Sequence, residues 1–178
     1  HLMTDARLER LRSAMSAGSL VILGPRSLVK DLDDCWLETP LPGGLAAALG
    51  GHVVEGLSQT LPVTVVPGDA PAGPWTDVLE VDVADDDPEP VEVLARYGGP
   101  SYLAGSIAAL RRGDLAYVGA SSVEAWTTIL TPLLIGRGLP VLPPQIGVER
   151  FERGGRRIAL DHVALTITGS PAWDPGAA

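Results

Sequence analysis

Aromatic side chains are scarce in this sequence. They form 4% of the 178 residues, whereas apolar residues as a class form 46%. A core with so few rings has to be built from Leu, Val, Ile and Ala, a composition that suits helices packed on a buried parallel sheet. The length is sufficient to bury such a core without disulfide bonds. The composition therefore predicts a folded α/β protein of one domain, or of one domain with a small appendage.

Basic residues are also few, because 13 Lys and Arg stand against 22 Asp and Glu and the formal net charge is -9. Nucleic acids and anionic membranes attract proteins chiefly through cationic side chains, so this balance argues against both kinds of partner. No apolar run approaches the roughly 18 residues that span a bilayer, and the N-terminus lacks the apolar core of a signal peptide. The single cysteine cannot form an internal disulfide, which fits a reducing compartment. We therefore expect a cytoplasmic protein.

Side chains that commonly carry chemistry are sparse as well. Cys35, the only thiol, lies among acidic neighbours in DLDDCWLE and not on the glycine-flanked elbow of an amidotransferase nucleophile. No metal-binding spacing links the histidines, which are His1, His52 and His162. Asp85 to Asp87 lie beside proline without an aromatic sugar platform, which favours a solvated loop over a pair of glycosidase carboxylates. The sequence thus predicts no catalytic residue, no metal ion and no cofactor.

One long segment is expected to lie on the surface. PRSLVKDLDDCWLETPLP (25–42) has mixed polarity and contains three prolines. Long ordered loops are usually functional or interfacial, so this segment is expected to contact another subunit. The candidate subunit-contact residues are Lys30, Asp31, Asp33, Asp34 and Trp36. Binding of an ion by the three aspartates remains an alternative use of the same loop.

Hydrophobic periodicity predicts helices that alternate with strands. Leu8, Leu11 and Met15 recur at helical spacing over residues 5–17, and Gly18 ends that helix. A second, short helix is expected between the glycine pairs at 43–51. Apolar or β-branched runs predict strands at 19–24, 52–57, 62–68 and 77–83.

Other segments are defined by turn residues or stay ambiguous. Polar and apolar residues alternate over 77–83, which predicts a half-buried strand, whereas 91–99 fits either a helix or a strand. Gly113 and Asp114 predict the two-residue turn of a β-hairpin. Ser121 and Glu124 predict a capping box at the start of a helix that Pro132 kinks. The loop 119–122 is the best candidate for an anion site, although the capping box already engages its amides.

The elements divide the chain into five parts. Residues 1–3 are expected to be a cloning remnant, 4–140 an α/β domain, 141–146 a proline-rich linker, 147–170 a short β module and 171–178 a frayed tail. A doubly wound domain usually opens with a strand near the middle of its sheet, whereas this chain opens with a helix. We therefore expect the first strands of the domain to be absent.

Several segments, in this order, resemble the C-terminal half of glycoside hydrolase family 42, the β-galactosidases. The segments are ARLERLRSAMSAGSLVILGPRSLVKDLDD, PLPGGLAAALGGHVVEGL, VEVLARYGG, LRRGDLAYVGASS and GVERFERGGRRIALDH. Positions that match the family pattern are Ser27, Lys30, Asp31, Pro42, Gly43, Leu49, Gly50, Val53, Glu55, Tyr97, Tyr117, Val118, Gly119 and His162. Departures from it occur at Leu28, Arg112 and Asp161. The resemblance covers roughly residues 5–168.

The resemblance implies an assembly role. In that family an amidotransferase-like middle domain takes part in trimer formation and lacks the amidotransferase nucleophile. The two catalytic glutamates lie on a preceding (β/α)₈ barrel, and no stretch of this chain could form a barrel of about 250 residues. No catalytic residue is carried over. The implied partners are the barrel of a parent enzyme and further copies of the chain, as a trimer in the parent or a dimer of the isolated chain.

The favoured interpretation is an α/β fold: a partial class I glutamine amidotransferase-like (flavodoxin-like) three-layer domain followed by a small antiparallel β module. Its function would be the non-catalytic oligomerisation of a β-galactosidase. Two alternatives remain. The first is a stand-alone small-molecule-binding or regulatory domain, and the second is an amidotransferase-like hydrolase that uses Cys35.

Overall fold

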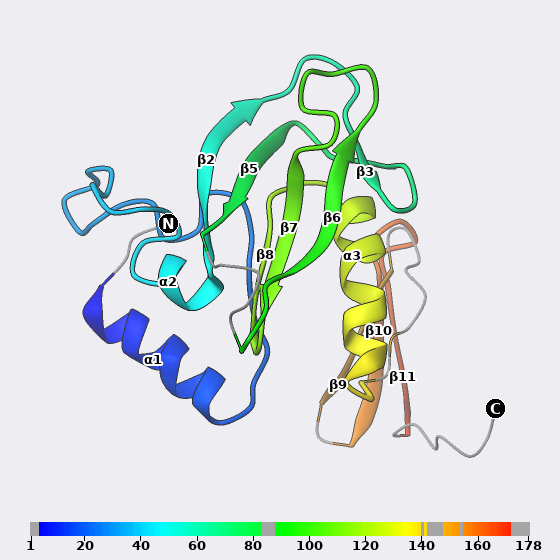
Figure 1. Cartoon of the computed structure of the whole chain (residues 1–178). Coiled ribbons are helices and arrows are strands. Elements are labelled where there is room, and N and C mark those ends of the chain that lie inside the picture. The colour runs from blue at the N-terminus through cyan, green and yellow to red at the C-terminus, as the bar shows by residue number, and fades with distance from the viewer. Residues whose placement is uncertain (1–3, 83–87, 140, 142–147, 154, 172–178) are drawn as a thin grey trace. The chain divides into compact units, whose positions relative to one another are not determined.

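Residues 4–82, 88–139, 141, 148–153 and 155–171 are described by the computed structural model shown in Figure 1. The chain divides into two units, His1–Gly138 and Leu139–Ala178. Several expectations concern residues outside the described ones: the cloning remnant at 1–3, the aspartates at 85–87, nearly all of the linker 141–146 and the tail from 172.

The first unit contains three helices and eight strands in its described residues. The helices are α1 (Asp5–Ser16), α2 (Ala46–Leu49) and α3 (Val123–Gly136). The strands are β1 (Val21–Leu23), β2 (Gly51–Ser58), β3 (Thr64–Val66), β4 (Ala70–Pro71), β5 (Trp75–Val81), β6 (Glu92–Gly98), β7 (Ile107–Arg112) and β8 (Leu115–Val118).

The strands form one curled, branched sheet. Its main order is β1-β8-β7-β6-β3-β4, while β5 pairs with β7 through Leu79 and Ile107, and β2 pairs with β5. Among the described strands only β1 and β8 run parallel. The parallel sheet that the core composition suggested is therefore not what forms. An aliphatic core is compatible with either direction, and most neighbouring strands here are joined by hairpins or loops that reverse the chain.

Helices pack against both faces of the sheet where β7 and β8 lie. Leu8 of α1 and Leu49 of α2 pack in one apolar cluster with Leu110 and Tyr117. Ile129 of α3 packs in a second cluster, which contains Ala109 and Val118 from the opposite face of the same strands. Successive strand residues point to opposite faces, so β8 is buried throughout its length because each face meets a helix.

Two local predictions are confirmed. Helix α1 ends at Ser16, and Gly18 follows with a left-handed φ of 81°. The hairpin between β7 and β8 turns through Gly113 and Asp114, since Arg112 pairs with Leu115. The ambiguous run 91–99 forms strand β6.

Two other predictions are wrong. The N-cap of α3 is Ser122, whose Oγ accepts a hydrogen bond from the Ala125 amide at 3.0 Å, so the predicted capping box begins one residue too early. The Ser121 Oγ accepts from the Trp75 amide instead. Strand β5 is not half-buried, because four consecutive residues, 76–79, are buried between its neighbours.

The second unit contains a three-stranded antiparallel sheet. Its order is β11-β10-β9, with β9 at Val148–Arg153, β10 at Arg156–Asp161 and β11 at Thr166–Pro171. Ile158 lies opposite Phe151, and Leu160 lies opposite Ile167, so these apolar residues share one face of the sheet.

Candidate subunit-contact site

The five candidate contact residues lie together on a small hairpin that follows β1. We call residues 30–36 the arm. Lys30 and Trp36 pair as an antiparallel bridge, and the Asp31 amide donates to the Cys35 carbonyl at 2.9 Å. The arm stands away from the sheet beside α2, at the left of Figure 1. The sequence therefore identified a real structural feature, although its pairing as a hairpin was not foreseen.

Polar contacts within the arm fix its tip. One carboxylate oxygen of Asp31 accepts from the Asp33 and Cys35 amides, each at 2.9 Å. The Lys30 Nζ and the Asp34 carboxylate form an ion pair at 2.9 Å. Asp34 adopts a left-handed φ of 62°, a conformation that aspartate tolerates better than most residues. In the described part of the chain no cluster of acidic, histidine or cysteine side chains could hold a metal ion, so the alternative ion site is not supported.

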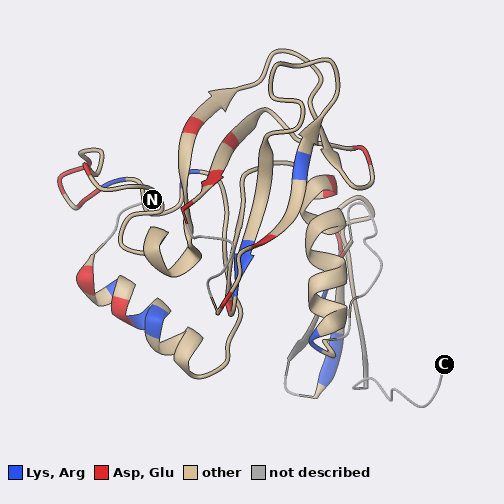
Figure 2. Cartoon of the chain, in the orientation of Figure 1, with Lys and Arg blue, Asp and Glu red and all other residues tan. Residues whose placement is uncertain are grey.

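The arm presents apolar and acidic side chains to solvent. Leu32 is 69% exposed and Trp36 is 55% exposed. Three aspartates and one lysine surround them, and the acidic residues of this loop are red in Figure 2. Exposed apolar side chains rimmed by charge are typical of a surface that binds another protein.

The base of the arm is held by buried groups. Leu28 and Val29 are buried, and the Leu37 amide donates to the Val29 carbonyl at 3.0 Å. Just before them, the Arg26 amide donates to the Asp77 carboxylate at 3.0 Å. The arm therefore begins at a fixed point on the sheet.

Asp77, only 3% exposed, is the centre of a buried polar network. Its carboxylate also accepts from the Trp75 indole at 2.7 Å and from the Tyr117 hydroxyl at 2.6 Å. Its carbonyl accepts from the Tyr97 hydroxyl at 2.9 Å. Burial, and secondly the charge of Asp77, raise the pKa of both tyrosines, which keeps their hydroxyls protonated as donors.

The remaining candidates for chemistry lie apart from one another. Cys35 is exposed on the arm, and its Sγ lies 3.7 Å from the Asp33 carbonyl. His52 contacts the Asp82 carboxylate at 2.9 Å, and His162 in the second unit contacts Glu149 at 3.4 Å. The structure brings none of these groups together into a catalytic arrangement among its described residues.

In the predicted anion loop 119–122, backbone amides donate hydrogen bonds to carbonyl groups of the same chain. The Ser121 and Ser122 amides both donate to the Ala72 carbonyl, at 2.8 and 3.1 Å, and the Gly119 amide donates to the Ala108 carbonyl. The Ser122 hydroxyl donates to the Pro71 carbonyl. These three backbone amides are therefore not available to bind an anion.

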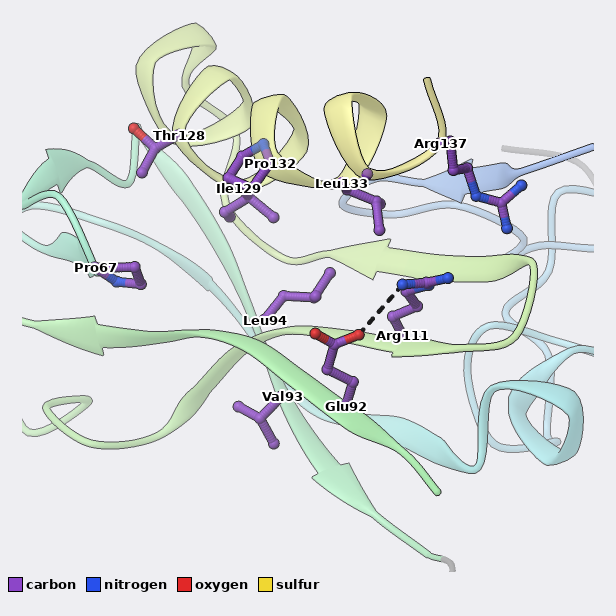
Figure 3. Close-up of a pocket in the computed structure, with 11 residues that line it drawn as sticks. Pro67, Glu92, Val93, Leu94, Arg111, Thr128, Ile129, Pro132, Leu133 and Arg137 are labelled. Carbon is purple, nitrogen blue, oxygen red and sulfur yellow. Dashed lines mark hydrogen bonds and ion pairs between the residues drawn. The ribbon is translucent and has the colours of Figure 1, made fainter. Parts of the chain in front are cut away.

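A groove that the sequence did not predict lies between α3 and the sheet. We call it the α3 groove, and its volume is about 360 Å³. Figure 3 shows apolar side chains in the middle and charged ones at one end. Its lining residues include Leu94, Ile129, Pro132, Leu133, Arg111 and Arg137. Residues of strands β6 and β7 and of α3 meet here only through tertiary folding, so no local sequence signal could have revealed the groove.

Both arginines of the α3 groove are held by carboxylates. Arg111 lies 3.4 Å from Glu92, which also lines the groove, and Arg137 pairs with Asp114. Ion pairs thus border one end of an apolar cavity. No described helix is both long enough and apolar enough to cross a membrane.

Comparisons with known proteins identify the family. Residues 1–137 match the model of the β-galactosidase trimerisation domain. Among solved structures, a polyextremophilic β-galactosidase from the Antarctic haloarchaeon Halorubrum lacusprofundi is 27% identical, with a TM-score of 0.71, over 91% of this chain and 25% of that one. A search among curated proteins finds no match.

Two further solved structures show the same fold at lower identity. A β-galactosidase from Bacillus circulans sp. alkalophilus is 18% identical, with a TM-score of 0.69, over 96% of this chain and 30% of that one. A family 42 β-galactosidase from G. stearothermophilus is 15% identical, with a TM-score of 0.67, over 89% of this chain and 24% of that one. The chain spans between about a quarter and a third of the length of these relatives. The resemblance inferred from the sequence is confirmed, and the chain belongs to the β-galactosidase trimerisation domain family.

Proposed function

We propose that this chain is a non-catalytic assembly region and that its arm makes the contact with another subunit. The observation that carries the proposal is the pair of exposed side chains, Leu32 and Trp36, on a hairpin whose base is fixed by buried contacts. A rigid support limits the conformational entropy lost on association. The family description supports the same role, because it names trimerisation as the property of the domain.

Mass measurement tests this proposal directly. Light scattering coupled to gel filtration, over a tenfold range of concentration, should give a mass two or three times the 18.5 kDa of the chain. A trimer follows the family description, and a dimer would show that the arm pairs differently in this chain. A monomeric mass at every concentration would contradict the proposal.

Absence of catalysis is the second part of the proposal. Among the described residues that line the α3 groove, Glu92 alone carries a carboxylate, whereas glycosidase chemistry needs two. The relatives are about three to four times longer than this chain. The catalytic barrel of a parent β-galactosidase is the expected partner. Incubation with a chromogenic galactoside should give no turnover above a buffer blank, and activity that follows the protein through purification would contradict this.

The relationship of the first unit to a known domain type is the third part of the proposal. We infer that the first unit corresponds to part of a class I amidotransferase-like domain, with the segment 141–146 as a linker to the β module. Support comes from the parallel pair of β1 and β8 and from helices on both faces of the sheet. The single cysteine supports a cytoplasmic location.

A further inference from the structure

We propose that the α3 groove receives the arm of a second copy of this chain, so that subunits associate head to tail. This inference rests on the proposed assembly function and assigns the surface that the arm binds. Two properties of the groove support it: its chemistry matches that of the arm, and it lies on a different side of the same unit.

The chemistry of the two surfaces is complementary. The arm offers Leu32 and Trp36 among three aspartates and one lysine. The α3 groove offers an apolar cavity of about 360 Å³ with Arg111, Arg137 and Glu92 at one end, so two cationic side chains and one carboxylate leave a single net positive charge on its lining. A cavity of this size lies in the range of small-ligand sites, roughly 300–1,000 Å³, and can admit large apolar side chains. Uncovered apolar residues continue around it, since Val66 is 44% and Val93 37% exposed.

The position of the two surfaces excludes contact within one copy. The arm follows β1, which ends the sheet on one side, whereas the groove adjoins β6 and Pro67, which follows β3, toward the other end of the strand order. Figure 1 shows the arm and α3 on opposite sides of the first unit, with the sheet between them. Contact between two different patches is heterologous, and such contacts close into rings when the rotation permits. Three copies joined in this way would form a trimer.

Two substitutions separate the surfaces experimentally. Trp36→Ala removes the largest side chain of the arm, and Pro132→Glu adds an acidic group to the groove. Each should weaken association at least about tenfold, because truncated aromatic anchors and like-charge contacts typically cost that much. Pro132 is exposed within α3, and a helix accepts glutamate better than proline, so folding should be preserved.

Two control substitutions resemble these changes but should not weaken association. Pro132→Lys alters the same position with the opposite charge and should leave association with the acidic arm intact. Tyr102→Ala removes an aromatic side chain that is 74% exposed outside both surfaces. Equal weakening by Pro132→Glu and Pro132→Lys would contradict the charge complementarity on which the proposal depends.

Mixing the two defective chains is the decisive experiment. The Pro132→Glu chain keeps its arm and the Trp36→Ala chain keeps its groove, so one intact contact can form between them. Native mass spectrometry should therefore show each variant alone as a monomer and the mixture as a one-to-one complex. A mixture that stays monomeric, or a Pro132→Glu chain that assembles like the wild type, would overturn the proposal.

The outcomes also distinguish this inference from the function on which it rests. A monomeric wild-type chain would contradict the assembly function itself. Suppose instead that the wild-type chain is oligomeric and that Trp36→Ala dissociates it but Pro132→Glu does not. The arm would then still be a subunit contact, and only the α3 groove would be ruled out as the surface that it binds.

Discussion

Asp77 should contribute more to stability than any exposed acidic residue of the first unit. Its buried carboxylate accepts three hydrogen bonds, from Arg26, Trp75 and Tyr117, at 3.0, 2.7 and 2.6 Å. In Asp77→Asn the amide oxygen can replace the oxygen that accepts from both Arg26 and Tyr117. The amide nitrogen then faces the indole N–H of Trp75, so two donors meet without an acceptor.

The magnitude follows from these contacts. Loss of a hydrogen bond to a charged acceptor costs about 1.5–3 kcal/mol, and a buried donor left unsatisfied adds about 1–3 kcal/mol. We therefore expect Asp77→Asn to lower the free energy of unfolding by about 3 kcal/mol. That is a large part of the 5–15 kcal/mol that is typical of a domain.

Urea unfolding followed by circular dichroism measures this difference. Asp82→Asn is the matched control, because its side chain is 50% exposed and contacts only His52 among the partners that the structure describes. An exposed ion pair contributes about 0–1 kcal/mol, so the control should be nearly neutral. Equal effects of the two substitutions, or a loss below about 1 kcal/mol for Asp77→Asn, would refute the reasoning.

Three further predictions concern the same unit. Burial raises the pKa of Tyr97 and Tyr117 above the ordinary value of about 10, so the unfolded state loses these protons first as the pH rises. The free energy of unfolding should therefore fall above pH 10 by up to about 1.4 kcal/mol per pH unit per tyrosine. The tyrosinate absorbance of these two residues should appear only on unfolding. Ser122→Ala should lower the free energy of unfolding by about 1 kcal/mol and speed hydrogen exchange of the amides in the first turn of α3. Ser121→Ala should leave those amides protected, and the reverse result would place the cap at Ser121. Gly119→Ala should cost about 3 kcal/mol in urea unfolding, because the added methyl would overlap a backbone carbonyl of β5, and a neutral effect would show that β5 can move away.

Local signals were sufficient where an element depends on its own residues. The spacing of Leu8, Leu11 and Met15 identified α1 because a helix places every third or fourth residue on one face. Gly113 and Asp114 identified the hairpin because few residues adopt the backbone of a two-residue turn. The arm was located as a surface excursion from its prolines and mixed polarity, whereas the subunit contact of its five named residues stays a prediction. The family was recognised from several short segments taken in order, and the match of residues 1–137 to the trimerisation-domain model confirms it.

Tertiary structure decided everything that depends on distant segments. Alternation along β5 indicated one exposed face, yet Asp77 is buried, because donors from residues 26 and 117 reach its carboxylate and compensate for its desolvation. Ser122 rather than Ser121 caps α3, because Ser121 is engaged by the Trp75 amide across the fold. The α3 groove combines Pro67, residues of β6, β7 and α3, and Arg137, which lie up to 70 positions apart, from 67 to 137. A sequence fixes which side chains are apolar or charged along each element, whereas the packing of those elements determines which of them share a cavity.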